Sequence, residues 1–155
     1  MRVSGKEMWV GCAIVAALVM GIVVGLTLHP GTAEAQAART ISGASGIFFN
    51  YIKPEATADF EQVMRKVGEA LQQSDNPDRQ QQAQGWKVYR VQESGPNGSV
   101  IYAWFLDPAV SGADYAVSQI LNEAFPAEVQ ALYETYSATF SGGQAIMNLD
   151  LVVDF

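Results

Sequence analysis

The chain has 155 residues, of which nine are basic and sixteen are acidic, and its formal net charge is −7. This balance argues against nucleic acid and anionic lipid surfaces as partners, because both attract positively charged proteins. The single cysteine, Cys12, cannot form a disulfide framework, so a hydrophobic core has to stabilise the fold by itself.

An apolar segment, residues 8–28, contains no charged residue and dominates the start of the chain. Arg2 and Lys6 precede it, and the small-residue sequence Ala33-Glu34-Ala35 follows it. These are the parts of an export signal that is cleaved after that sequence. The segment exceeds the usual signal core of about 7–15 residues and reaches the roughly 20 that span a bilayer, so an uncleaved membrane anchor is the alternative. We therefore predict an exported domain, residues 36–155, that is periplasmic or extracellular or is held at the membrane through residues 8–28.

Cleavage at this position would remove both Cys12 and His29, the chain's cysteine and histidine. The exported domain would then hold neither a thiol nor an imidazole. Serine and cysteine triads need these groups, and a zinc site would have to use carboxylates alone. We therefore predict no metal site and no cofactor.

The first part of the domain has the pattern of a strand followed by a helix. Residues 36–45 are small and polar, which indicates a flexible tether. Residues 47–52 are aromatic and β-branched, which is typical of a strand. Pro54 and Glu55 suit the first turn of a helix. That helix has one apolar face, formed by Phe60, Val63, Met64, Val67 and Leu71.

The middle of the chain predicts a β-hairpin. Residues 75–84 have no apolar stripe, which predicts a loop with room for a short extra turn of helix. Residues 86–93 and 99–106 have strand composition, and Gly95-Pro96-Asn97-Gly98 lies between them. Because Asn-Gly between two strand-like runs favours a tight turn, we expect these strands to pair.

The last part repeats the helix-then-strand pattern. Residues 114–124 and 127–140 are helical in pattern, with a break near Pro126. Gly142-Gly143 indicates the helix end, and residues 145–153 form an alternating strand. The apolar stripe of the second helical segment has the same spacing as the first and consists of Val129, Leu132, Tyr133, Tyr136 and Phe140.

This order of elements predicts the fold class. Strand, helix, strand, strand, helix, strand is the ferredoxin-like βαββαβ arrangement, an α+β fold, which we expect over residues 46–155. Right-handed crossovers would place both helices on one face of a four-stranded antiparallel sheet. In residues 99–106 the side chains of both faces are apolar, so the other face should be covered too. A second copy of the chain is the simplest cover, which predicts a homodimer.

The chain resembles the dimeric α/β-barrel superfamily, in particular its antibiotic-biosynthesis-monooxygenase-like members. The resemblance is carried by Phe48-Phe49-Asn50-Tyr51-Ile52-Lys53-Pro54-Glu55, by Phe60, and by the hairpin of residues 86–106 with Trp104. It implies a cofactor-free oxygenase or a haem-degrading enzyme that uses a strand asparagine and a strand tryptophan, which Asn50 and Trp104 match. Haem-degrading members also need a histidine ligand, which the exported domain lacks, and this argues against haem.

Four residues form the candidate ligand site. The Asn50 amide can both donate to and accept from a ligand, and Trp104 can form a stacking wall. Arg90 and Asp150 are a candidate polar pair, with Asn148 and Asp150 expected on the second side of the sheet. The alternative for each is structural: Asn50 and Trp104 in the core, Arg90 and Asp150 at a dimer rim.

Two functions remain open from the sequence. One is a domain that binds a small apolar or aromatic molecule, with cofactor-free oxygenase chemistry as the enzymatic form. The other is a non-enzymatic envelope protein with a structural or protein-binding role. A pocket lined by Asn50 and Trp104 with a path to solvent would favour the first, and a filled interior the second.

We predict that the chain produced with its own leader begins at Gln36, because the preceding small residues form a cleavage site. Mass spectrometry of the secreted or periplasmic protein would give this N-terminus. Recovery of an intact Met1 in the membrane fraction would instead establish the anchor.

Overall fold

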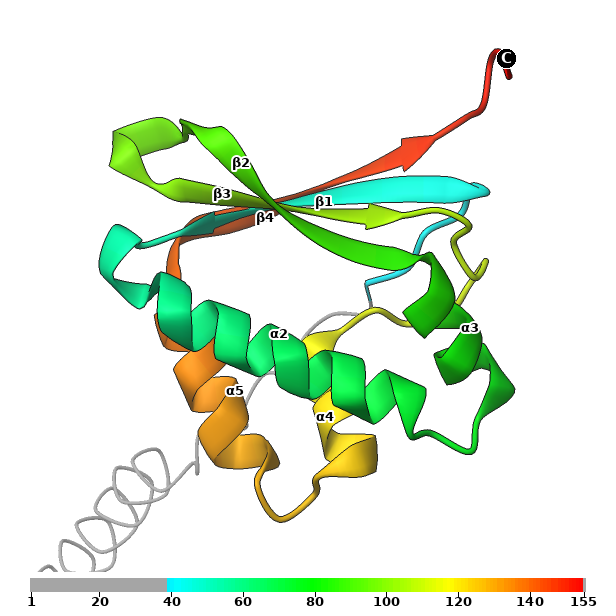
Figure 1. Cartoon of the computed structure of the whole chain (residues 1–155), viewed down its shortest axis with the longest axis horizontal. Coiled ribbons are helices and arrows are strands. Elements are labelled where there is room, and N and C mark those ends of the chain that lie inside the picture. Colours follow the sequence, from blue (N-terminus) through cyan, green and yellow to red (C-terminus); the bar gives the residue numbers. More distant parts are fainter. Residues whose placement is uncertain (1–38, 155) are drawn as a thin grey trace, which may run out of the picture. The chain divides into compact units, whose positions relative to one another are not determined.

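The computed structural model describes residues 39–154 (Figure 1). The predicted leader or anchor, residues 1–35, and the beginning of the predicted tether lie outside these residues. Within the described part, no helix is long and apolar enough to cross a membrane. Residues 36–155 form a compact unit of their own, which contains the whole core described below.

The sheet has four antiparallel strands. They are β1 (Ser45–Ile52), β2 (Trp86–Ser94), β3 (Val100–Leu106) and β4 (Phe140–Leu149). Their order across the sheet is β2-β3-β1-β4, so β1 and β3 are central and β2 and β4 are edges. This is the predicted ferredoxin-like α+β sheet.

The helices lie together on one face of this sheet (Figure 1). They are α2 (Thr57–Gln72), α3 (Pro77–Gly85), α4 (Val117–Ala124) and α5 (Val129–Ala138). Two 3-10 turns, η1 (Pro54–Ala56) and η2 (Pro96–Gly98), complete the elements. The gap between α4 and α5 confirms the predicted break near Pro126.

The local signals correctly locate α2 and the hairpin. Phe60, Val63, Val67 and Leu71 are buried as the stripe predicts, and Met64 is partly buried against the same core. Asn97 adopts a left-handed φ of 55° in the turn, a conformation that asparagine tolerates better than most residues.

Residues 77–85 are a full helix, α3, where the sequence indicates a loop with at most a turn. Pro77 stands at its start, and the Asn76 side chain accepts a hydrogen bond from the Asp78 amide as an N-cap. The apolar stripe is missing because this helix buries polar side chains, Arg79 and Gln82, against the fold.

The last strand begins earlier than predicted, at Phe140, and ends at Leu149. Phe140 pairs with Ile52 of β1, so Gly142 and Gly143 lie inside an edge strand and do not end a helix. The predicted faces of this strand are wrong as well. Asn148 stands opposite Gly46 on the helix-covered side, and its Oδ1 accepts a hydrogen bond of 2.9 Å from the Ser42 amide.

The described part of the predicted tether is packed onto the domain. Ile41 has no exposed surface, and Thr40 forms a β-bridge with Asp114. Gly46 makes room for the Ile41 side chain, since a Cβ at that position would collide with it. The small and polar composition of residues 36–45 therefore does not indicate that Ile41 is buried.

Candidate functional site

The register of the strands places the predicted site residues on one side of the sheet. A row of four side chains crosses its helix-covered face in the order Arg90, Tyr102, Asn50, Gln144. The next row contains Val88, Trp104, Phe48 and Ile146. Asn50, Arg90 and Trp104 therefore share this face.

Both polar atoms of the Asn50 amide form hydrogen bonds within the protein. Its Nδ2 donates to the Tyr102 carbonyl at 3.1 Å, and its Oδ1 accepts from Gln144 Nε2 at 2.5 Å. Gln144 also donates to the Tyr136 hydroxyl at 3.2 Å and accepts from Arg39 Nε at 2.9 Å. This network links β1 to both neighbouring strands and to α5.

Trp104 lies in an aromatic cluster. Its ring centroid is 5.4 Å from Phe48 and 4.9 Å from Trp86. Trp104 is 1% exposed and Asn50 is 0% exposed. A water molecule cannot contact a side chain that has no accessible surface, either from outside the protein or from an enclosed cavity. The interior around Asn50 and Trp104 is thus filled.

Arg90 and Asp150 do not meet within one chain. Arg90 belongs to β2, at one edge of the sheet, and Asp150 follows the end of β4 at the other edge. Both residues are exposed. Among residues 39–154 the ion pairs all involve helix residues instead, namely Arg65–Glu61, Lys66–Glu69 and Arg79–Glu123.

Tyr102 is a member of the polar row that is not among the four predicted site residues. Its hydroxyl donates to Glu61 Oε1 on α2 at 2.6 Å. Burial, followed by this hydrogen bond, raises the pKa of Tyr102 to about 12. The phenol therefore stays protonated at neutral pH and acts as a donor that ties the sheet to α2. The sequence shows that Tyr102 lies two residues before Trp104 in a strand and therefore shares its face of the sheet. It does not show that Glu61 is the hydrogen-bond partner of Tyr102.

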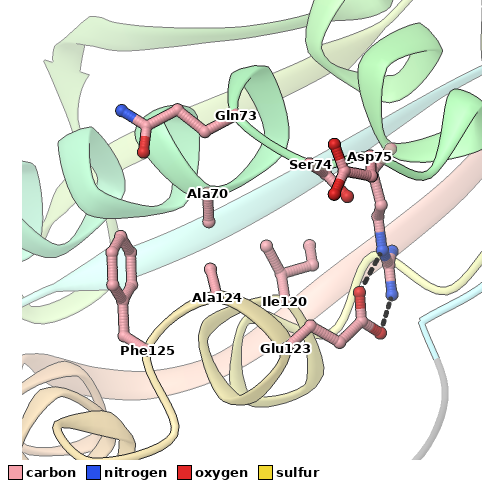
Figure 2. Close-up of a pocket in the computed structure, with 9 residues that line it drawn as sticks. Ala70, Gln73, Ser74, Asp75, Ile120, Glu123, Ala124 and Phe125 are labelled. Atoms are coloured by element: carbon pink, nitrogen blue, oxygen red, sulfur yellow. Dashed lines mark hydrogen bonds and ion pairs between the residues drawn. The ribbon is translucent and has the colours of Figure 1, made fainter.

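A polar depression lies between helices, with no strand residue in its lining (Figure 2). It measures about 250 Å³ and contains the buried side chain of Arg79. Arg79 donates two hydrogen bonds to the Glu123 carboxylate, one from Nε at 2.9 Å and one from Nη2 at 2.7 Å. Arg79 Nη1 also donates to Gln82 and to the Asp114 carbonyl. Its charge is thus neutralised internally, and we assign the depression no ligand. It is lined by Ala70, Gln73, Ser74, Asp75, Arg79, Ile120, Glu123, Ala124 and Phe125.

An apolar groove lies between α2, α3 and the edge strand β2. It measures about 130 Å³, and Trp86 forms part of its wall. A Cβ built on Gly68 would meet nothing within 4 Å, so this glycine leaves the groove open. The indole nitrogens of Trp86 and Trp104 have no hydrogen-bond partner. The groove is lined by Met64, Val67, Gly68, Leu71, Gln72, Ala83, Trp86 and Val88.

The uncovered face of the sheet carries two further rows that run through all four strands. One is Tyr89–Ala103–Phe49–Ala145 and the other is Lys87–Phe105–Ile47–Met147. Seven of these eight side chains are apolar or aromatic. On the edge strands Tyr89 is 53% exposed and Met147 is 50% exposed, whereas on the central strands Phe49 and Phe105 are partly exposed and Ala103 is buried.

Within residues 39–154 no cluster of three or more histidine, cysteine, aspartate or glutamate side chains could hold a metal ion.

No protein-family model matches the chain, and no curated protein matches it. Among solved structures, the chain is similar to a proposed antibiotic biosynthesis monooxygenase from Caulobacter crescentus CB15, with 16% sequence identity and a TM-score of 0.38. The match covers 74% of this chain and 94% of the other.

We predict that Asn50→Ala lowers the free energy of unfolding of residues 36–155 by about 2–4 kcal/mol, because it leaves a small cavity and unpaired groups on Gln144 and Tyr102. Asn122→Ala, on the exposed surface of α4, is the matched control and should change it by less than about 0.5 kcal/mol. Urea unfolding measures both. An Asn50→Ala protein as stable as the control would mean that the network does not hold the strands.

Proposed function

We propose that the domain is a non-catalytic, exported module that assembles into a homodimer through the uncovered face of its sheet. The two rows of apolar side chains across that face are the observation that carries this proposal. This proposal corresponds to the second function left open by the sequence, a non-enzymatic envelope protein with a structural or protein-binding role.

The composition of the uncovered face favours a second copy as its cover. An exposed apolar surface that crosses a whole sheet is unfavourable in water and is typical of an interaction site. Lys87 is the one charged side chain in the two rows, and it stands on the edge strand β2. Two copies related by a two-fold axis could therefore bring Phe49, Ala103 and Phe105 together without burying a charge at the centre.

The packing of the interior supports a non-catalytic role. A catalytic asparagine needs access to its substrate, and the Asn50 amide is fully buried and bonded to Tyr102 and Gln144. Trp104 is likewise enclosed by Phe48 and Trp86. The structural role for both residues is thus favoured over the ligand site. The leader-like segment, residues 8–28, is the basis for placing the module outside the cytoplasm.

We expect residues 36–155 to have twice the monomer mass by light scattering at micromolar concentration, and Ala145→Asp to shift the protein to the monomer. Ala145 ends the apolar row on the edge strand β4, next to Phe49, and an unpaired carboxylate there would be buried on dimerisation. Ala131→Asp on the exposed side of α5 is the matched control and should remain dimeric. A wild-type domain that is monomeric would overturn the proposal.

A second candidate function, binding of a small apolar molecule, is favoured by the groove beside Trp86. Its volume of about 130 Å³ suits a compound of one or two aromatic rings, and its lining is mostly aliphatic. An acceptor on such a compound could also engage an unpaired indole N–H after a small rearrangement.

For this candidate we expect 1-naphthol to shift the NMR signals of the Gly68 amide and the Trp86 indole N–H in a titration of residues 36–155. Gly68→Leu would fill the groove and abolish these shifts, whereas Gly68→Ala, which adds one methyl group in open space, would retain them. Shifts that are spread over the sheet, or unchanged by Gly68→Leu, would remove the groove as a site.

A further inference from the structure

Large and small side chains alternate along one row of the uncovered sheet face. This alternating row consists, from β2 across to β4, of Tyr89, Ala103, Phe49 and Ala145. Tyr89 is 53% exposed and Phe49 is partly exposed, whereas Ala103, which lies between these two rings, is 7% exposed. At each step across the sheet, an aromatic ring therefore stands beside a single methyl group.

The alternating row is complementary to its own reverse. Taken from β4 to β2, the order becomes small, large, small, large, so each ring of one order stands opposite a methyl group of the other. Contacts of large against small side chains let two layers interdigitate, whereas two rings at the same point would hold the layers apart. A two-fold axis brings the same patch of two copies together, so this face fits a second copy of the chain.

We infer that the two-fold axis of the dimer is parallel to the strands and passes between β1 and β3. This inference rests on the proposed homodimer. Such an axis keeps each residue at its height along the strands and exchanges the two edges, because β2 and β4 are opposite edges of one sheet. The alternating row then meets its own reverse. Phe49 of each copy packs on Ala103 of the other copy, and Tyr89 packs on Ala145.

The second row of this face agrees with the same axis. It consists, from β2 to β4, of Lys87, Phe105, Ile47 and Met147. Lys87 would lie against Met147 of the other copy at the rim, where its aliphatic stem can pack and its ammonium group can stay in water. The two Lys87 side chains of the dimer would stand at opposite edges. An axis across the strands would instead place β2 on β2, so that these like charges share one edge, which is unfavourable.

The test is an exchange of side-chain size between two copies. Tyr89→Ala removes a ring at one edge of the sheet, and Ala145→Tyr adds a ring at the other. Three strand spacings of about 4.8 Å separate the two positions within one chain, so one change cannot compensate the other there. Both positions lie on edge strands and have access to solvent in the single chain, so we expect both variants to fold, which circular dichroism checks.

Each variant of residues 36–155 by itself should raise the dissociation constant of the dimer about tenfold or more, the first through a cavity and the second through overlapping rings. A mixture of the two variants should form a heterodimer with a dissociation constant within about threefold of the wild type. The ring added at position 145 of one copy fills the space left at position 89 of the other, and the second contact is unchanged.

Sedimentation equilibrium gives the dissociation constants, and native mass spectrometry of differently tagged copies gives the share of heterodimer. This share should exceed that of random pairing. Ala131→Tyr, on the exposed side of α5, is the matched control in place of Ala145→Tyr and should give no excess of heterodimer.

The outcomes separate this inference from the dimer itself. An excess of heterodimer supports the axis parallel to the strands. A wild-type dimer that Ala145→Asp dissociates, together with a mixture that shows no excess of heterodimer, overturns the pairing of Tyr89 with Ala145 and leaves the dimer. A monomeric wild-type domain overturns both.

Discussion

The structure depends on the register of β1 between β3 and β4. Because side chains alternate between the two faces of a sheet, a slip of one residue would turn Asn50 outward and Phe49 into the core. The Asn50 amide opposes this slip, since it donates to the Tyr102 carbonyl on one side and accepts from Gln144 on the other. Neither bond could form in another register. A polar group in an aromatic core thus selects one arrangement among several that apolar contacts alone would permit.

Elements with local signals could be predicted from the sequence. The stripe of α2 and the Asn97-Gly98 turn each depend on residues close together in the chain, and both are where the pattern places them. The start of β4 could not be found in this way, because Phe140 fits a helical stripe equally well and joins the sheet only through its pairing with Ile52. Likewise α3 has no apolar face to detect, since what it buries is the Arg79 side chain.

The candidate site, too, could be predicted from the sequence only in part. Residue type identifies Asn50 as unusual in an apolar strand, and it is indeed the centre of a polar network. Its partners Gln144 and Tyr102 are far away in the sequence, so the hydrogen bonds of the amide could only be learned from the fold. The two faces of the sheet therefore differ in how their side chains are covered. On the helix-covered face, hydrogen bonds and aromatic contacts within the chain surround the side chains, whereas on the uncovered face Phe49 and Met147 can contact a neighbouring molecule.

The hydrogen bonds of Arg79 have a consequence for where this domain can fold. One guanidinium joins α3, α4 and the segment before α4, through Glu123, Gln82 and the Asp114 carbonyl. Small extracellular domains often make such long-range connections with disulfides, which require an oxidising compartment. Here the connection consists of an ion pair between the buried Arg79 and the half-exposed Glu123, together with hydrogen bonds to Gln82 and to the Asp114 carbonyl, so it forms under reducing and oxidising conditions alike. The fold of residues 39–154 is therefore independent of thiol chemistry on either side of a membrane.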